Sequence, residues 1–314
     1  MQDLKTQILS PSEAGISRAA TLLSSGALVA FPTETVYGLG ADARNSLAAA
    51  KIFEAKGRPR FNPLIVHVVS VDHAQNLVTW SDTAQLLADA FWPGPFTLVL
   101  PMKAGHGLSP LVTAELHTLA IRVPAHTIAQ ALLATFAGPV AAPSANPSGR
   151  ISPTSAAHVF AGLGGKISAV LDDGPCTVGV ESTIVNLAGT PTLLREGGLT
   201  REQIEQVLGK RLMATPDSEA ITAPGQLASH YAPRASVRLN AKAVLPGERM
   251  LGFGDVDGDL NLSETADLAQ AAARLFEYLH QMDVSDQPIA VAPIPDIGLG
   301  RAINDRLTRA AAPR

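Results

Sequence analysis

Residues 56–67 read KGRPRFNPLIVH, and this stretch decides how the first half of the chain folds. Pro59 and Pro63 fix their own φ angles and bias the residue before each toward extended backbone, so the segment between them is a stiff loop. The apolar residues 47–55 before it predict a helix that ends at Gly57, and the apolar run LIVHVV after it predicts a strand. A rigid cationic loop that joins a helix to a strand is typical of an α/β unit.

Positive charge is concentrated around this loop. Between residues 44 and 60 there are five basic residues and one acidic residue, a local charge of +4 in a chain whose net charge is −4. Lys56 and Arg58 could simply complement the negative end of the preceding helix, which would stabilise it by roughly 0.3–1 kcal/mol each. One cation would satisfy the helix end, so the charge count favours an anion pocket.

Length and composition set the class of protein. A chain of 314 residues with 46% hydrophobic content predicts a globular protein of two domains. It has 24 Lys and Arg against 28 Asp and Glu, which excludes a nonspecific nucleic-acid binder of the strongly basic kind. No secretory leader pattern and no run of about 18 apolar residues occurs, so a soluble cytoplasmic protein without membrane contact is expected. Cys176 is the single cysteine and is expected to serve packing.

Helix and strand patterns alternate along the chain and predict an α/β fold. In the first part, strands are expected at residues 27–31, 96–100, 119–124, 140–142, 170–171 and 181–185, and helices at 12–25, 80–91, 152–160 and 200–208. In the last part, strands at 249–252 and 289–292 flank a helix at 263–282, and a final helix follows Gly300. The expected division is a first domain at 1–212, a linker rich in Pro, Ala, Ser and Thr at 213–235, and a small α/β domain at 236–314.

Polar side chains follow several predicted strands, at the edge where open α/β sheets bind ligands. Thr33 and Thr35 follow the first strand, and Ser144 and Asn146 follow the strand at 140–142. Hydroxyl, amide and backbone N–H groups before a helix suit phosphate, although a plain turn or helix cap is the alternative at both places. Arg122 interrupts an apolar strand and is expected either to be exposed or to clamp a carboxylate with its planar fork.

Common catalytic motifs are missing from the sequence. Residues 162–167, GLGGKI, lack the spacing and the Ser or Thr of a P-loop, and neither a complete GxGxxG nor an HExxH occurs. Rossmann dehydrogenases and zinc hydrolases are therefore disfavoured. Chemistry that relies on positioning and charge neutralisation is expected, rather than a covalent nucleophile.

Four stretches occur in order: PTETVYGL, KGRPRFNPLIVH, APSANPSGRISPTSA and VGVESTIV. Together they resemble the YrdC-type threonylcarbamoyl-AMP synthases, and APGQLASHYAP with the C-terminal domain resembles the longer, two-domain branch of that family. The resemblance covers nearly the whole chain and implies a YrdC-like twisted mixed sheet with flanking helices and a ligand-binding concavity, followed by a smaller Rossmann-like α/β domain. The chain departs from the family pattern at Asp173, where Gly is frequent, and at Asn186, where Asp is common.

The resemblance implies a nucleotidyltransferase. Such enzymes join L-threonine, bicarbonate or CO2, and ATP into L-threonylcarbamoyladenylate and release pyrophosphate. A partner transferase complex then moves the threonylcarbamoyl group to an adenosine of certain tRNAs, so a transient contact with that complex and a weak contact with tRNA are expected. Mg²⁺ is expected on the phosphate oxygens of ATP, with no metal ligand from the chain and no organic cofactor.

The resemblance also assigns residues. Those expected to contact threonine are Thr35, His67, Arg122, the backbone of Ala142, and Ser182. Those expected to contact ATP are Lys56, Arg58, Asn62, Thr118, Ser144, Asn146, Ser152, Arg195 and Tyr231. Within this set Lys56, Arg58, Ser144 and Asn146 are the expected catalytic residues. The linker is expected to fold over the pocket as a lid through Tyr231, with an ordinary linker as the alternative.

Two other functions remain open. A carbamoyl-adenylate enzyme with another acceptor would release pyrophosphate without needing threonine. A nonenzymatic RNA-binding module would need a basic surface, yet residues 1–210 contain 14 Lys and Arg and 15 Asp and Glu, a net charge of −1. That balance weakens the RNA-only alternative.

Overall fold

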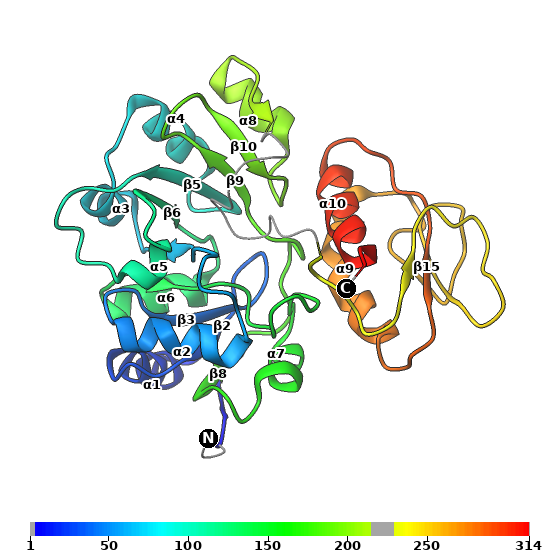
Figure 1. The fold of residues 1–314 in the computed structure, drawn as a ribbon, viewed down its shortest axis with the longest axis horizontal. Helices are drawn as coiled ribbons and strands as arrows, with labels where there is room; N and C mark the ends of the chain where they lie inside the picture. Colours follow the sequence, from blue (N-terminus) through cyan, green and yellow to red (C-terminus); the bar gives the residue numbers. More distant parts are fainter. Residues whose placement is uncertain (1–3, 215–228, 314) are drawn as a thin grey trace.

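The computed structural model describes residues 4–214 and 229–313, and these ranges form a larger N-terminal part and a smaller C-terminal part that lie side by side (Figure 1). Among the described residues, the larger part contains a mixed sheet in the order β1-β8-β2-β3-β7-β4-β6-β5-β9-β10-β11, and the smaller part a sheet in the order β12-β15-β13-β14. The predicted α/β class, with a mixed sheet in the first part, is confirmed.

The helices of the larger part are α1 (Glu13–Ser24), α2 (Ser46–Lys56), α3 (Val71–Leu77), α4 (Asp82–Phe91), α5 (Pro110–Thr113), α6 (Thr127–Phe136), α7 (Ala156–Leu163) and α8 (Arg201–Leu208). Its strands are β1 (Gln7–Leu9), β2 (Val29–Phe31), β3 (Gly38–Asp42), β4 (Val66–His67), β5 (Phe96–Pro101), β6 (Thr118–Arg122), β7 (Val140–Ala141), β8 (Ala169–Leu171), β9 (Thr183–Asn186), β10 (Thr192–Arg195) and β11 (Met213–Ala214). The smaller part consists of β12 (Val237–Arg238), β13 (Arg249–Gly252), β14 (Leu260–Asn261), α9 (Leu268–Met282), β15 (Ile289–Val291) and α10 (Leu299–Ala311).

Strand alternation divides the large sheet into two faces. In β2, Val29 and Phe31 pack with α1 and α6 on one face, whereas Ala30 belongs to the main core with α2 on the other face. The α1 and α6 face continues across β4, β6, β5, β9 and β10, where a small apolar cluster includes Ile65 and Ile184. Helices α1 and α6 cover one end of this face and leave the other end for the polar site described below.

The smaller part is a parallel sheet packed against two helices. All its strand pairs, β12 with β15, β13 with β15 and β13 with β14, run parallel. Helix α9 packs on α10, and its apolar stripe, which includes Leu275 and Leu279, is fully buried. This arrangement agrees with the expected small Rossmann-like α/β domain.

The two parts meet closely. Gly179 has φ +78°, and a Cβ atom added to it would lie 2.4 Å from the Ala272 carbonyl oxygen in α9, so this contact requires glycine. The His280 ring stacks on the His158 ring with centroids 3.8 Å apart, and its Nε2 donates to the Ser152 carbonyl at 3.1 Å. Close backbone and ring packing therefore fixes α9 against the larger part.

Local signals located most elements correctly. Helix α2 has the expected Gly57 at its end, in the left-handed conformation with φ 61°, and Thr200 forms the predicted capping box with Gln203. The predicted strands recur as β2, β5, β6, β7, β8, β9, β13 and β15, with ends that shift by one or two residues. Cys176 is buried in the main core, as predicted, and burial raises the pKa of its thiol to about 12.

Three element boundaries differ from the predictions. Helix α7 begins after Ser155, not at Ser152, because the Ser155 hydroxyl caps it by accepting from the His158 N–H. Helix α9 likewise begins after Asp267 rather than at Ser263, because the Asp267 carboxylate accepts the first free N–H groups. The strand expected at 64–69 is shorter in the structure, where only β4 (Val66–His67) is a strand.

The predicted linker is only partly described. Met213–Ala214 pairs with β10 as β11, and residues 215–228 lie outside the described ranges. None of the described helices is long and apolar enough to cross a bilayer.

Candidate active site

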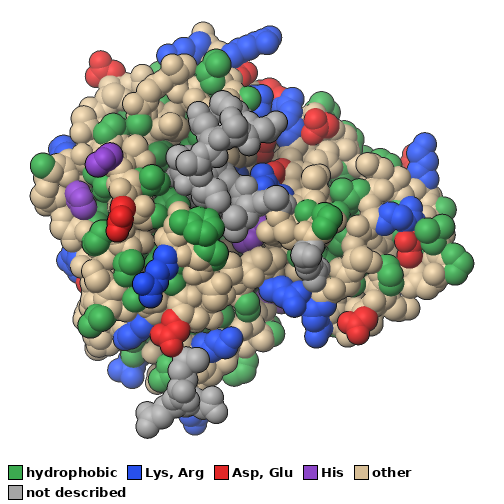
Figure 2. Space-filling model, in the orientation of Figure 1, with side chains coloured by type: hydrophobic (Ala, Val, Ile, Leu, Met, Phe, Trp, Pro, Cys, Tyr) green, Lys and Arg blue, Asp and Glu red, His purple; other side chains and the backbone are tan. Residues whose placement is uncertain are grey.

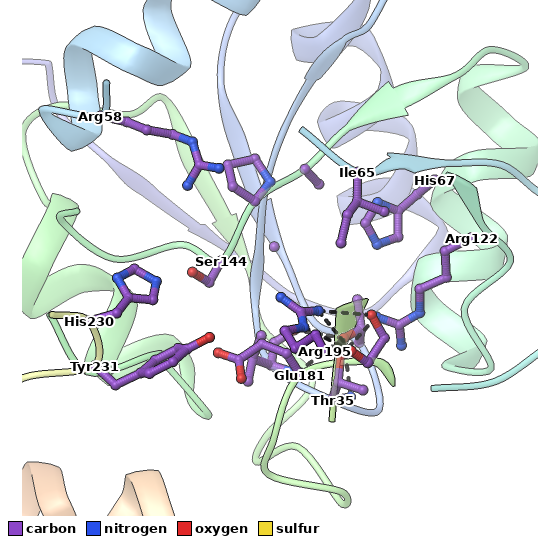
Figure 3. Close-up of a pocket in the computed structure, with 16 residues that line it drawn as sticks. Thr35, Arg58, Ile65, His67, Arg122, Ser144, Glu181, Arg195, His230 and Tyr231 are labelled. Carbon is purple, nitrogen blue, oxygen red and sulfur yellow. Dashed lines mark hydrogen bonds between the residues drawn. The ribbon is translucent and has the colours of Figure 1, made fainter. Parts of the chain in front are cut away.

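A cavity opens on the sheet face that α1 and α6 leave uncovered. Its volume is about 50 Å³, and it is lined by both charged and apolar residues. Nine of the residues predicted from the sequence line it: Thr35, Arg58, His67, Arg122, Ala142, Ser144, Ser182, Arg195 and Tyr231 (Figure 3). The structure thus brings together residues from the four quoted stretches, from β6 and β10, and from the linker.

The register between β4 and β6 places His67 beside Arg122. The two strands are parallel and these residues are direct partners, so both side chains lie on the same face. Burial, with the neighbouring Arg122 charge, lowers the pKa of His67 to about 3. His67 is therefore a neutral imidazole at physiological pH, and it can donate or accept a hydrogen bond but adds no charge.

Arg122 is buried, so the prediction that it might be exposed is wrong. Its Nε donates to the Gly94 carbonyl at 3.1 Å, its Nη1 donates to the Thr35 hydroxyl at 3.0 Å, and its Nη2 donates to the Glu34 carboxylate. Thr33 does form the local turn that was the alternative at this position, because its hydroxyl accepts from the Thr35 N–H and donates to the Val36 carbonyl. That turn presents the Thr35 hydroxyl to Arg122.

Two further arginines line the cavity, Arg195 near Thr35 and Arg58 on the opposite side (Figure 3). Arg195 donates through Nε and Nη2 to the Ser182 carbonyl at 3.0 and 2.8 Å, and Nη2 also reaches the Ser182 hydroxyl. Arg58 lies at the far side of the cavity in Figure 3 and donates through Nη2 to the Pro63 carbonyl at 3.0 Å. Burial lowers the pKa of Arg58 to about 10, so its guanidinium stays charged at neutral pH. Proline-fixed carbonyls therefore hold this cation in place.

Lys56 lies behind the cavity wall and does not line it. Its Nζ donates to the Ser144 carbonyl at 2.5 Å and to the Asn146 carbonyl, so it ties the end of α2 to the loop after β7. Burial, followed by repulsion from Arg58, lowers the pKa of the Lys56 ammonium well below its ordinary value. In this structure Lys56 positions the loop that carries Ser144.

Four other predicted residues also lie outside the cavity lining. Asn62 is buried beside Arg58, which donates from Nε to the Asn62 carbonyl at 3.4 Å. Asn146 donates through Nδ2 to the Pro147 and Arg150 carbonyls, and the Ser152 hydroxyl donates to Glu181. Thr118 begins β6, four residues before Arg122, and therefore lies about 13 Å from it along the strand. The position of the cavity gives no support to a role for Thr118 in binding.

Residues that the sequence predictions did not assign also belong to the site. Glu181 and His230 line the cavity, and Glu34 holds Arg122. Each is adjacent in sequence to a predicted residue or turn, so adjacency was an available signal. Arg306 in α10 donates to Glu181 and had no local signal, because it is one position of an amphipathic helix.

Tyr231 comes from the end of the linker. It has φ 60° and is 1% exposed, and its hydroxyl end points into the cavity (Figure 3). Burial raises the pKa of this hydroxyl to about 12, so it remains a neutral donor. The described end of the linker is thus packed into the site.

The excess of buried positive charge favours an anionic ligand at this site. Among the described residues, five Lys and Arg side chains but only two Asp and Glu side chains are buried, and all seven line the cavity or contact a residue that does. Several buried polar atoms of this site lack a hydrogen-bond partner, including Nδ1 of His67 and Nδ1 of His230. Such groups are uncommon in folded proteins and are typical of a site that expects a ligand.

Comparison with known proteins agrees with this site. The Sua5/YciO/YrdC family model, described as telomere recombination, matches residues 21–197. The model described as the threonylcarbamoyl-AMP synthase C-terminal domain matches residues 199–312. Both fit the order of the two sheets in the structure.

Individual relatives match over nearly the full length. The threonylcarbamoyl-AMP synthase of Bacillus subtilis is 41% identical, over 98% of this chain and 96% of its own. The threonylcarbamoyl-AMP synthase of Pyrococcus abyssi is also 41% identical, over 94% of each chain. The crystal structure of P. abyssi Sua5 complexed with L-threonine superposes with a TM-score of 0.90 at 39% identity and covers 98% of each chain.

These matches confirm the resemblance found in the four sequence stretches and in the C-terminal part. Because a family model covers more than half of the chain and full-length relatives share about two residues in five with it, the chain belongs to the Sua5/YciO/YrdC family, in the branch that carries the threonylcarbamoyl-AMP synthase C-terminal domain.

Proposed function

We propose that this protein is an L-threonylcarbamoyladenylate synthase, which forms its product from L-threonine, bicarbonate or CO2, and ATP and releases pyrophosphate. The observation that carries the proposal is one cavity with two unlike halves. Arg122, His67 and Thr35 form a half suited to a small zwitterion, whereas Arg58 and Ser144 belong to a half suited to phosphates, and Arg195, bonded to Ser182, adds a cation beside the first half. Relatives with the same two domains carry the name of this activity.

The amino-acid half binds L-threonine in this proposal. A relative of the same length and fold was crystallised with L-threonine. The Arg122 guanidinium would bind the threonine carboxylate, sharing its charge with Glu34, while Thr35 and Ser182 offer hydroxyls and neutral His67 offers a ring nitrogen. The Ala142 backbone, next to Ile65, completes this half.

The nucleotide half neutralises phosphate charge. Arg58 and Arg195 line the cavity from different segments. Lys56 holds the loop that carries Ser144, and the hydroxyl and backbone N–H of Ser144 can donate to phosphate oxygens. The described residues contain no group of three or more His, Cys, Asp or Glu that could hold a metal ion. The proposal therefore has Mg²⁺ bound by phosphate oxygens and water, where it would offset phosphate charge.

The reaction needs two anions to meet. The neutral amine of threonine first forms a C–N bond to the carbon of CO2 and loses a proton, which gives a carbamate; with bicarbonate, a water molecule is released instead. A carbamate oxygen then forms a bond to the α-phosphorus of ATP while the bond from that phosphorus to the bridging oxygen breaks, and the electron pair leaves with pyrophosphate. Arg58 and Arg195 lower the repulsion between these anions, and Arg122 keeps the amino acid aligned.

The linker acts as a lid in this proposal. Tyr231 and His230 line the cavity, so opening of this end of the linker would give the nucleotide a wider entrance. Closed again, they would exclude water from a labile mixed anhydride. The product would then pass to a tRNA-modifying transferase in the cytoplasm by a transient contact.

Two alternative functions differ in what they require. A carbamoyl-adenylate enzyme with another acceptor would need an acceptor that uses the same carboxylate-binding half. A nonenzymatic RNA-binding module is weakly supported, because Lys, Arg, Asp and Glu side chains are interspersed on the face drawn in Figure 2 without one broad basic area. A weak tRNA contact near the cavity remains compatible with the enzyme.

The proposed function predicts that pyrophosphate release from ATP requires threonine and bicarbonate together. Omitting threonine should lower the rate at least tenfold, because only the carbamate offers the attacking oxygen. Pyrophosphate release with serine and glycine in place of threonine serves as the control for acceptor choice. A rate that is independent of threonine would rule out this function, and an equal rate with another acceptor would favour the first alternative.

Arg58→Ala should lower turnover about 100-fold or more, because its cation stabilises phosphate charge that shifts during transfer. Arg60→Ala is the matched control, since Arg60 is an exposed arginine of the same loop. Lys56→Ala should lower turnover less but should lower the melting temperature, because two buried carbonyls lose their donor. Turnover and melting are measured for all three, and near-normal turnover of Arg58→Ala would contradict the assignment.

Arg122→Lys should weaken threonine binding about tenfold or more and leave ATP binding unchanged. Lysine keeps the charge but loses the planar fork, and charge-assisted hydrogen bonds contribute roughly 1.5–3 kcal/mol each. Arg58→Lys is the reciprocal control and should weaken ATP instead. Calorimetry with each ligand separates the two effects, and equal weakening of both ligands by Arg122→Lys would be incompatible with a carboxylate contact.

The lid proposal predicts that ATP and threonine together slow backbone hydrogen exchange at residues 229–235. In this proposal the segment opens for entry and is held closed over bound substrates, so its exchange should slow at least tenfold. Exchange in β6, which stays in the sheet, provides the internal reference. Unchanged exchange at 229–235 would identify this segment as ordinary domain packing.

A further inference from the structure

Arg306 is a buried cation of the C-terminal part that is bonded to a residue of the cavity lining. It lies in α10, is 0% exposed, and donates from Nε to Glu181 Oε2 at 2.9 Å. Its Nη1 donates to Asp305 in the same helix. A residue 125 positions away in sequence is thus bonded to a side chain that lines the proposed nucleotide site.

Glu181 needs this partner because of where it lies. It is an acid in a cavity that otherwise presents Arg58 and Arg195, and its other oxygen accepts from the Ser152 hydroxyl at 2.5 Å. A buried carboxylate without a cation is costly and would repel a triphosphate placed in the same cavity. With Arg306 bonded to one oxygen and Ser152 to the other, the charge of Glu181 is compensated.

Arg306 also contacts the linker residue that closes the cavity. Its guanidinium carbon lies 5.3 Å from the centroid of the Tyr231 ring, within the range of a cation–π contact. Phe276 of α9 stacks against the same ring with centroids 5.6 Å apart, and the His230 N–H donates to the Arg309 carbonyl in α10 at 3.2 Å. Helices α9 and α10 therefore determine where Tyr231 lies.

We propose that Arg306 is a positioning residue for the nucleotide: it compensates the Glu181 carboxylate and fixes the Tyr231 ring, so that the C-terminal domain completes the ATP site. This inference rests on the proposed function, because it assumes that the cavity receives ATP. In this proposal Arg306 controls ATP affinity through Glu181 and Tyr231, although it belongs to the second domain and does not line the cavity.

Domain packing alone does not account for a charged residue at this place. Burying an ion pair carries a large desolvation cost, and apolar residues of similar size often stabilise a contact as well or better. The same helix makes a second contact with the larger part through Arg301 and Glu202, but that pair is partly exposed and neither residue lines the cavity. Arg301 therefore offers a matched control for an ion pair that only joins the two parts.

The test compares three full-length variants with the wild type. Arg306→Met leaves Glu181 charged and unpaired, Glu181→Gln/Arg306→Met removes both charges, and Arg301→Met removes the exposed pair. Affinities for ATP and for threonine are measured separately by calorimetry, with KM values from pyrophosphate release and melting temperatures alongside. Tyr231→Ala is included as a reference for loss of the ring.

Arg306→Met should weaken ATP binding about tenfold or more, because removal of one member of a buried pair leaves the other charge uncompensated. Threonine affinity should change much less. The double variant should recover most of the ATP affinity, apart from the share that Tyr231→Ala also loses, and Arg301→Met should bind ATP like the wild type. If Arg306→Met does not fold, the neutral double variant still tests the inference. The double variant is expected to bind ATP at least as tightly as Tyr231→Ala does.

Three results would overturn the inference. They are unchanged ATP affinity in Arg306→Met, equal weakening of ATP and threonine, or ATP affinity in the double variant that falls below that of Tyr231→Ala. The proposed function fails differently, through a wild type that releases no pyrophosphate in response to threonine. In that event the calorimetric ATP affinities still decide the role of Arg306, and a wild type that does not bind ATP would refute both.

Discussion

A formal excess of buried positive charge is the constraint on which this structure depends. Among the described residues, Lys56, Arg58, Arg122, Arg195 and Arg306 are buried, against two buried acids, Glu34 and Glu181. Each cation carries a desolvation cost that the interior must offset with carbonyls or carboxylates. These cations line one cavity or contact residues that do, and this excess of positive charge favours an anionic ligand there.

The fold meets this requirement by giving each of these cations hydrogen-bond partners, most of which come from distant segments. Lys56 ends α2 and binds the loop after β7, Arg58 binds carbonyls of the proline-rich loop, and Arg122 at the end of β6 bonds to the turn after β2. Arg306 enters from α10 of the second domain. The site is therefore a junction of distant segments from the larger sheet, the end of the linker and the smaller part.

Local sequence was sufficient wherever a single side chain or a short pattern sets the structure. Gly57 ends α2 because it adopts a left-handed conformation, and Thr200 starts α8 through a capping box with its own neighbour. The predicted start of α7 was wrong because two serines compete at that place. Ser155 caps the helix, whereas the Ser152 hydroxyl is drawn to Glu181, a partner that no local pattern reveals.

By itself, the sequence determined the α/β class, the order of the elements, the cationic loop and, through motif resemblance, most of the residues that line the cavity. Only the tertiary structure decided that Arg122 is buried against Glu34, that Lys56 stands behind the wall, and that Arg306 reaches Glu181. The physical reason is range. Propensities, caps and strand alternation act over a few residues. The partner of a buried charge is instead set by packing between segments that are distant in sequence. Glu181 and Arg306, which are 125 residues apart, illustrate this.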